Sequence, residues 1–329
     1  MKLITRHYVM IRTLGAMCIA IAPLLAQAQS FPSRPVRLVV PAAAGGVTDI
    51  VARALAQELG SVWSHPTIVE NRPGAAQIIG AETVAKATPD GHTLIVSDSS
   101  AFVINPHLYR KLPYDPVRDF VAITTICQIA PVLGVNASLP VNTVAEFVAH
   151  AKAKSGALSY GSVGSGSYMH IAMEDFKRRT GADLIHVPYK GSTPAIQALI
   201  AGEIAAFVVH VGTMEQQARA GKIRLLAFAT PQRIPSHPNV PTIAESGVPG
   251  FETGTWFGVL GPSAMPRDTV QQIHQAMSKL TASAAFRSQY LAKFSLEPLN
   301  LSVEQFNDLM KRDLERWGPL VKASGATVD

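Results

Sequence analysis

Two short glycine-rich loops carry the clearest potential for binding chemistry in this chain. Residues 42–47 read Ala-Ala-Ala-Gly-Gly-Val, and residues 161–167 read Gly-Ser-Val-Gly-Ser-Gly-Ser. Each follows a short apolar run and precedes a helical pattern, so the free backbone N–H groups of a helix N-terminus should face an anion there. A tight turn would explain either loop alone. Two such loops, poor in charge and one of them rich in serine, favour a cradle for a carboxylate.

The sequence lacks the common signatures of nucleotide binding and of catalysis. Neither loop fits G-x-x-x-x-G-K-[ST], and no G-x-G-x-x-G follows the first strand. No serine stands in G-x-S-x-G, and H-E-x-x-H is absent. His170 and Glu174 could share a metal ion from one helix face, but no third ligand is indicated and a polar pair on a helix is the simpler interpretation. We therefore expect no metal, no cofactor and no catalytic residue.

Three further residues leave alternatives open. His210 ends an apolar run and could contact a ligand or be a core histidine, while Tyr160, beside the second loop, could contact a ligand or pack. Cys127 lies in an apolar stretch and is interpreted as a small core residue. An enzyme that uses Cys127 or His170 as its catalytic group is the alternative to a binding protein.

The first 28 residues are predicted to be a cleaved secretory signal peptide. Lys2, Arg6 and Arg12 precede an apolar core at residues 13–25, which is too short to span a bilayer, and Ala-Gln-Ala at 26–28 is a cleavage site. Cleavage leaves 301 of the 329 residues and lowers the formal net charge from +6 to +3. The mature protein is expected to be soluble in the periplasm. Its scattered basic residues argue against nucleic-acid binding.

The predicted elements describe nearly the same α/β unit twice. The first unit has strands at 36–40, 67–70 and 93–97, with helices from Thr48 or Asp49 to Gly60 and at 75–87. The second has strands at 158–160, 184–187 and 204–209, with helices from Ser167 to 179 and at 194–201. A strand at 256–260 and helices at 267–282 and 302–317 should pack back on the first unit. This order predicts two α/β domains with parallel sheets and ligands bound at the carboxyl ends of the strands.

Long motifs along the whole mature chain resemble the Bug/TctC family, the extracytoplasmic solute receptors of tripartite tricarboxylate transporters. They include FPSRPVRLVVPAAAGGVTDIVAR, VENRPGAAQIIGAETVAKATPDGHTL, INPHLYRKLPYDPVRDF, YGSVGSGSYMH, HVPYKGSTPAIQALIAGEI and VPTIAESGVPGFE. The resemblance implies the type II periplasmic-binding-protein fold, with a ligand cleft between two α/β domains joined by two crossover strands. Those crossovers are expected near 125–132 and 253–259. The first domain would comprise residues 29–128 and 254–329, and the second 129–253.

The resemblance also implies a function and a site. A monomeric receptor would capture a small organic carboxylate by domain closure and deliver it to the membrane permease subunits of a tripartite tricarboxylate transporter. The first loop usually touches one end of the ligand through backbone groups and waters, and the second holds a carboxylate directly. The expected ligand-binding residues are Ala42, Ala43, Ala44, Gly45, Gly46, Val47, Tyr160, Gly161, Ser162, Gly164, Ser165, Gly166, Ser167, His170, Thr193 and His210.

The chain departs from the family pattern at two places. Ala44 stands where the first loop commonly has proline, and Ala205 and Val209 stand where the family often has acids. A pocket without those acids is less suited to an ammonium group, so we expect a dicarboxylate or an aromatic carboxylate. Preferential binding of a basic amino acid would contradict this. The sequence does not separate a transport receptor from a ligand sensor that feeds a signalling partner.

Overall fold

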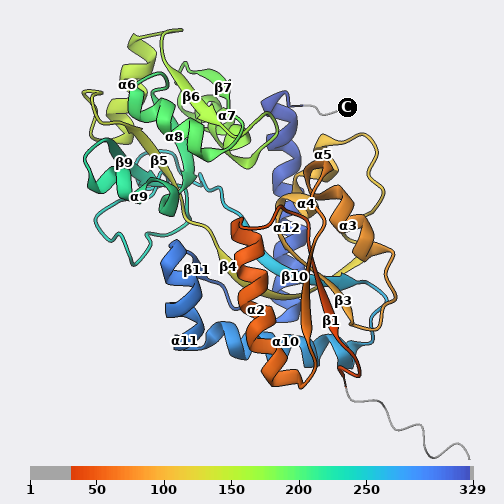
Figure 1. Ribbon diagram of the computed structural model, residues 1–329. Helices are drawn as coiled ribbons and strands as arrows, with labels where there is room; N and C mark the ends of the chain where they lie inside the picture. The colour runs from red at the N-terminus through yellow and green to blue at the C-terminus, as the bar shows by residue number, and fades with distance from the viewer. Residues whose placement is uncertain (1–30, 327–329) are drawn as a thin grey trace, which may run out of the picture.

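The strands of the protein form two separate sheets, each at the centre of an α/β domain. The computed structural model describes residues 31–326, and the predicted signal peptide lies outside them. One sheet has the strand order β11-β4-β10-β3-β1-β2 and the other β7-β6-β8-β5-β9. Figure 1 shows the two domains as separate lobes, with the second domain in yellow-green to green. The two α/β domains expected from the sequence are confirmed.

The first domain is built from both ends of the chain. Its N-terminal elements are β1 (Val36–Val40), α2 (Val47–Trp63), β2 (Thr67–Asn71), the 3₁₀ helix η2 (Ala75–Gln77), α3 (Ile78–Ala85), β3 (Thr93–Asp98), α4 (Ser100–Val103), α5 (Asn105–Leu108) and β4 (Phe120–Gln128). Its C-terminal elements are β10 (Trp256–Pro262), α10 (Arg267–Ala282), α11 (Ala284–Phe286), the π-helix η3 (Arg287–Leu291), the 3₁₀ helix η4 (Ala292–Phe294), β11 (Glu297–Pro298) and α12 (Val303–Ser324).

The second domain is one continuous segment. Its elements are β5 (Pro131–Asn136), α6 (Val144–Ala153), β6 (Ser159–Ser162), α7 (Tyr168–Thr180), β7 (Ile185–Pro188), α8 (Ser192–Ala201), β8 (Ala206–His210), α9 (Val211–Arg219) and β9 (Ile223–Phe228).

The two sheets share one topology, as the repeated pattern in the sequence predicts. The order β2-β1-β3-β10-β4 in the first domain corresponds to β7-β6-β8-β5-β9 in the second. The prediction of purely parallel sheets is wrong, because β10 runs antiparallel to β3 and β4, and β5 runs antiparallel to β8 and β9. Both of these strands arrive from the other domain and not through a helical crossover, which is the connection that makes strands parallel.

Two adjacent crossover segments join the domains. The chain passes from β4 to β5 through Ile129 and Ala130, and it returns through residues 253–255 to β10. The backbone N–H of Ile129 donates to the carbonyl of Thr255 at 3.1 Å, so the two segments lie side by side. Both lie within the ranges expected for the crossovers. Such a pair of short connections is suited to a hinge.

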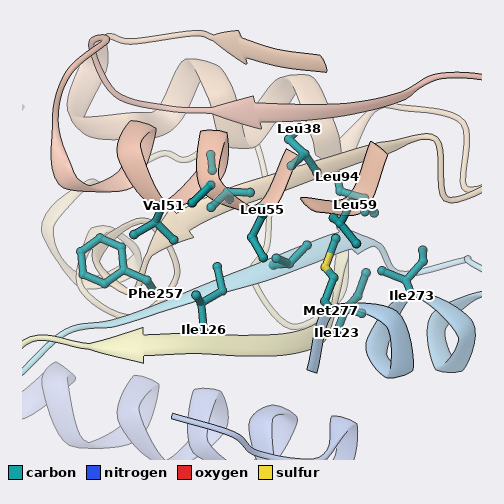
Figure 2. Packing of buried hydrophobic residues seen from close by; sticks show 14 of the residues in the cluster. Leu38, Val51, Leu55, Leu59, Leu94, Ile123, Ile126, Phe257, Ile273 and Met277 are labelled. Atoms are coloured by element: carbon teal, nitrogen blue, oxygen red, sulfur yellow. The ribbon is translucent and has the colours of Figure 1, made fainter. Parts of the chain in front are cut away.

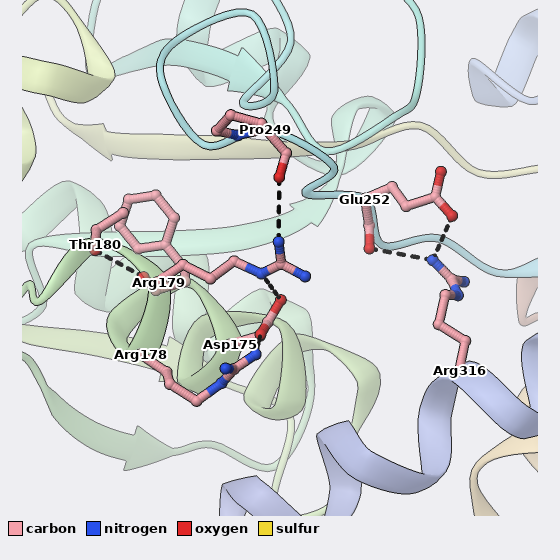
Figure 3. A network of polar contacts seen from close by, with 8 residues as sticks. Asp175, Arg178, Arg179, Thr180, Pro249, Glu252 and Arg316 are labelled. Atoms are coloured by element: carbon pink, nitrogen blue, oxygen red, sulfur yellow. Dashed lines mark hydrogen bonds and ion pairs between the residues drawn. The ribbon is translucent and has the colours of Figure 1, made fainter.

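Helix α12 fixes the second crossover to the first domain. Its Arg316 donates from Nη1 to Oε1 of Glu252 at 2.7 Å (Figure 3). Nη2 of the same side chain donates to Oδ1 of Asp313 at 3.0 Å. Asp313 also accepts from Nε1 of Trp256 at 3.0 Å. Burial raises the pKa of Asp313 above its ordinary value, in opposition to the charge of Arg316. Helix α12 therefore holds the chain in a fixed position where it leaves the second domain.

The core of the first domain confirms the apolar stripe predicted for α2. Val51, Leu55 and Leu59 are almost completely buried and recur every four residues, which places them on one helix face. They pack over the sheet together with Ile273 and Met277 of α10 (Figure 2). This packing holds α2 against β1, and with it the loop that joins them.

Two predicted helix ends are wrong. Gly60 does not end α2, which continues to the buried Trp63. The last helix does not end at Trp317 but runs through Pro319 to Ser324, with Gly325 in the left-handed conformation that ends a helix. Because Trp317 and Val321 are both buried, tertiary packing there outweighs the roughly 3 kcal/mol that an internal proline costs. No helix within residues 31–326 is both long enough and apolar enough to cross a membrane.

Candidate ligand-binding site

The two glycine-rich loops occupy equivalent positions in the two domains. The first loop (residues 42–47) leads from β1 into α2, and the second loop (residues 161–167) leads from β6 into α7. Residues 43–46 are exposed, as are Ser165 and Thr193, which lies in the first turn of α8. The carboxyl ends of β1 and β6 therefore present two accessible loops, each at the N-terminus of a helix longer than twelve residues.

A buried carboxylate organises the first loop. Asp49, only 2% exposed, accepts from the N–H of Gly45 and from Nε of Arg53, both at 2.9 Å. Asn71 donates to Asp49 at 2.9 Å and to the carbonyl of Ala42 at 3.1 Å. Burial disfavours the charged carboxylate, but these hydrogen bonds and the charge of Arg53 hold the pKa of Asp49 below its ordinary value. Asp49 stays ionised and ties both ends of the loop to α2.

The N-terminus of α2 is left open by this arrangement. The prediction that Thr48 or Asp49 is the N-cap is wrong. Gly46 is the N-cap, and no side chain accepts a hydrogen bond from the first turn in the N-cap manner. Asp49 instead reaches back to Gly45, one residue before the cap. The first N–H groups of α2 thus remain available to an anion.

A strained turn at residues 75–77 stands beside the first loop. The helix predicted over 75–87 is wrong there, because α3 begins only at Ile78. Ala75, Ala76 and Gln77 all have positive φ, at 45°, 50° and 78°. Asn105 fixes this turn by donating to the carbonyl of Ala76 at 2.7 Å, and the amide of Gln77 donates to Asp98 at 2.6 Å. Non-glycine residues in this region cost on the order of 1–3 kcal/mol each and cluster at functional sites. The turn belongs to the same carboxyl edge of the sheet, because Asp98 ends β3.

The second loop is held by side chains behind it. Ser167 is the N-cap of α7, as predicted, and its hydroxyl accepts from the N–H of His170 at 3.4 Å. Nδ1 of His170 accepts from the N–H of Gly166 at 3.2 Å, and Oγ of Ser162 accepts from the N–H of Gly164 at 3.0 Å. His170 is 6% exposed. These residues shape the loop from within the domain.

A stack of three rings supports those contacts. The ring of His186 lies 4.1 Å from that of His170 and 5.1 Å from that of Tyr160, and its Nε2 lies 2.6 Å from Oγ of Ser162. Tyr160 is completely buried, and its hydroxyl donates to Glu174 at 2.5 Å. Burial, and next the charge of His170, lower the pKa of His186 to about 4. Burial also lowers the pKa of His170. The stack is therefore neutral at neutral pH.

Replacing His186 with glutamine should make the protein's stability less dependent on pH. The folded state keeps His186 neutral down to about pH 4, whereas the unfolded chain protonates it near pH 6.5. The unfolded state thus binds more protons in that window, and stability is lost as pH falls through it. The measurement is the slope of melting temperature against pH, between pH 7 and 5, for the unchanged protein and for His186→Gln. Ser162→Ala removes the hydrogen bond without removing a titrating group, so it should lower the melting temperature without changing the slope. Equal slopes in His186→Gln and the unchanged protein would contradict the stack's role.

His210 is directed at the first domain. It lies at the end of β8, is 8% exposed, and its Nε2 donates to the carbonyl of Phe294 at 2.6 Å. Burial lowers its pKa, so the ring is neutral and Nε2 carries the proton. Ser295 donates to Glu215 of α9 at 3.0 Å beside it. These two bonds make a second contact between the domains, on the side of α9.

The groups considered for catalysis are poorly placed for it. Cys127 is completely buried in the core of the first domain, and burial raises the pKa of its thiol. A protonated, enclosed thiol is a poor nucleophile. His170 is occupied by Gly166 and by the ring stack. Within residues 31–326 no cluster of three or more His, Cys, Asp or Glu residues could hold a metal ion.

Comparisons with known proteins agree on one family. Residues 51–326 match the model of the tripartite tricarboxylate transporter family receptor. Protein BugT of Bordetella pertussis is 32% identical over 300 residues, which make up 91% of this chain and 92% of BugT. The solved structure of R. palustris Rpa4515 with adipate has a TM-score of 0.78 and 34% identity, and covers 91% of this chain and 100% of its own. That of MatC from Rhodopseudomonas palustris with bound malate has a TM-score of 0.74 and 30% identity, over 88% of this chain and 100% of its own.

Proposed function

Because the chain belongs to the tripartite tricarboxylate transporter family of receptors, we propose that it captures a small aliphatic dicarboxylate between its two domains and delivers it to membrane permease subunits. The observation that carries this proposal is the pair of accessible loops at equivalent positions of the two domains, each at a helix N-terminus. Two loops of this kind, one per domain, match a ligand with an anionic group at each end.

The two carboxylates would be held in different ways. The first loop offers the N–H groups at the start of α2, with no side-chain cap in competition. In the second loop the N–H groups of Gly164 and Gly166 are bonded to Ser162 and His170. What is offered to a ligand is the start of α7 together with the hydroxyl of Ser165 and, from α8, that of Thr193. Waters that bridge to the first loop would bind nearly as well as direct contacts. In this proposal Tyr160, Ser162 and His170 shape the loop and do not touch the ligand.

The similar proteins support the choice of ligand class. Adipate and malate, the acids in two of the solved structures, are both aliphatic dicarboxylates. The absence of acids at Ala205 and Val209 agrees with a ligand that has no amine.

Secretion with cleavage after Ala28 would place the receptor in the periplasm as a monomer, next to its permease. N-terminal sequencing of the exported protein should then begin at Gln29.

A thermal-shift screen of residues 29–329 tests the proposal. Adipate and malate are compared with benzoate, phthalate and lysine. A ligand of the native state raises its stability by about 2.7 kcal/mol at a hundredfold excess over Kd, so the dicarboxylates should shift the melting temperature. No shift with any acid, or a larger shift with lysine, would contradict it. Mass spectrometry of the acid after incubation should show it unchanged, whereas an enzyme that uses Cys127 or His170 would convert it.

A further inference from the structure

Tyr168 is the first residue of α7 and lies between the two domains. Its half-buried side chain packs against two core clusters of the first domain, the one that contains Val51 and Phe257 and the one that contains Ile104 and Trp256. It also packs against the cluster of the second domain that contains Val209. The phenol ring is thus enclosed by residues of both domains, directly beside the second loop.

The hydroxyl of Tyr168 meets the ends of two equivalent strands. The backbone of His210, at the end of β8, and the charge of Asp98, at the end of β3, both act on the pKa of this hydroxyl, so the ends of both strands lie near it. The strands β3 and β8 occupy the same position in their sheets. Burial raises the pKa of Tyr168, so the phenol is neutral. Asp98 itself is held by Gln77 at 2.6 Å and by the N–H of Ser100 at 2.8 Å, which fixes its position.

The start of α7 packs closely against the first domain on either side of Tyr168 in the sequence. Gly166, two residues before Tyr168, lies so close to Leu108 of α5 that a Cβ atom placed on it would stand 3.0 Å from the leucine side chain. Ile171, one turn further along α7, is completely buried in a core cluster of the first domain. The N-terminal turn of α7 therefore packs on the first domain, and Tyr168 cannot move away from that domain while these contacts hold.

We propose that Tyr168 sets the upper size limit of the ligand and restricts it to short aliphatic dicarboxylates. The inference rests on the proposed function, because an acid held at the starts of α2 and α7 must lie next to the first residue of α7. A longer or aromatic acid would need the volume that the phenol ring fills. The core clusters of both domains that pack against the ring hold it in that place.

Calorimetric titration of residues 29–329 with succinate, adipate, suberate and terephthalate tests the proposal. The unchanged protein should bind succinate or adipate at least about tenfold more tightly than suberate and terephthalate, a ratio within reach of a size-limited pocket. Tyr168→Ala should bring that ratio to about threefold or less. Tyr189→Ala is the matched control, since Tyr189 is a half-buried tyrosine packed against the second domain's own core. It should leave the ratio unchanged.

The outcomes separate this inference from the proposed function. If the unchanged protein binds none of the four acids, the proposed function fails and the size limit with it. If it binds short diacids and the ratio is the same in Tyr168→Ala, only the inference is overturned. Should Tyr168→Ala fail to fold, Tyr168→Leu replaces the ring with a smaller apolar side chain. It should also lower the ratio of affinities between the short diacids and the two larger acids. An unchanged ratio in that variant overturns the inference equally.

Discussion

Replacing Asp49 with alanine is expected to weaken dicarboxylate binding at least about tenfold and to lower the free energy of unfolding by about 2 kcal/mol. The carboxylate is buried and accepts from Gly45, Arg53 and Asn71. Without it these donors lose their partner, and the first loop loses the bonds that hold it to α2. The start of α2 can then no longer meet the ligand in a fixed geometry. Calorimetric titration with adipate measures the loss of affinity, and unfolding in urea measures the loss of stability.

Asp90→Ala is the control for a general loss of stability. Asp90 also accepts from an arginine, Arg34, and from a backbone N–H, that of His92, but it lies in the turn before β3, at the opposite edge of the sheet. This variant should lose stability and keep its affinity for adipate. Equal losses of affinity in both variants, or full affinity in Asp49→Ala, would show that the first loop does not bind the ligand.

Gly166→Ala is expected to lower the affinity for adipate by about tenfold, or 1.4 kcal/mol. A Cβ atom at this position would stand 3.0 and 3.3 Å from the two Cδ atoms of Leu108, which belongs to the other domain. That contact exists only when the domains are together, so the added methyl group penalises the closed form that holds the ligand. The positive φ of 80° adds strain of about 1 kcal/mol, but open and closed forms carry it alike.

Two companion variants isolate the contact between the domains. Gly156, in the segment before β6, also has a positive φ, 70°, but no atom lies within 4 Å of a Cβ built there. Gly156→Ala should therefore cost stability without a tenfold loss of affinity. Leu108→Ala combined with Gly166→Ala should restore most of the binding, since it removes the atoms that clash. A double variant as weak as Gly166→Ala alone would place the defect in the loop and not in closure.

Local signals in the sequence predict much of the fold. Glycines mark both loops, Ser167 caps α7, Gly202 ends α8 in the left-handed conformation, and four-residue periodicity predicts the buried face of α2. One such signal was missed: Thr143 caps α6 by accepting from the N–H of Glu146 at 3.1 Å, in a pattern of the capping-box type. These features depend on neighbours within a few residues, and they are the ones a sequence displays.

Other features depend on contacts between distant segments. The antiparallel direction of β5 and β10 follows from which domain each strand enters, and residue patterns within the strands do not encode it. The positive φ of Ala75, Ala76 and Gln77 is imposed by Asn105 and Asp98, which lie more than twenty residues away. No local propensity favours it.

The same limit applies to the site. Both loops could be predicted because a helix N-terminus preceded by glycines is a local pattern. Asp49 and His186 support these loops through Asn71 and Ser162, which lie 22 and 24 residues away along the chain. Tyr168 flanks the second loop by packing between the two domains. Judged by residue type alone, Asp49 would be a helix cap, His186 a core histidine and Tyr168 a tyrosine that packs in the core. Only the folded arrangement gives them a role at the site.

Hydrogen–deuterium exchange with and without adipate reports on both loops in one experiment. If adipate binds between the domains, the N–H groups at residues 43–49 and 164–170 should exchange more slowly together, at adipate concentrations that raise the melting temperature. Protection of both requires a ligand held between the two helix N-termini. Protection of one loop only, or of neither while adipate still stabilises the protein, would contradict binding between the domains.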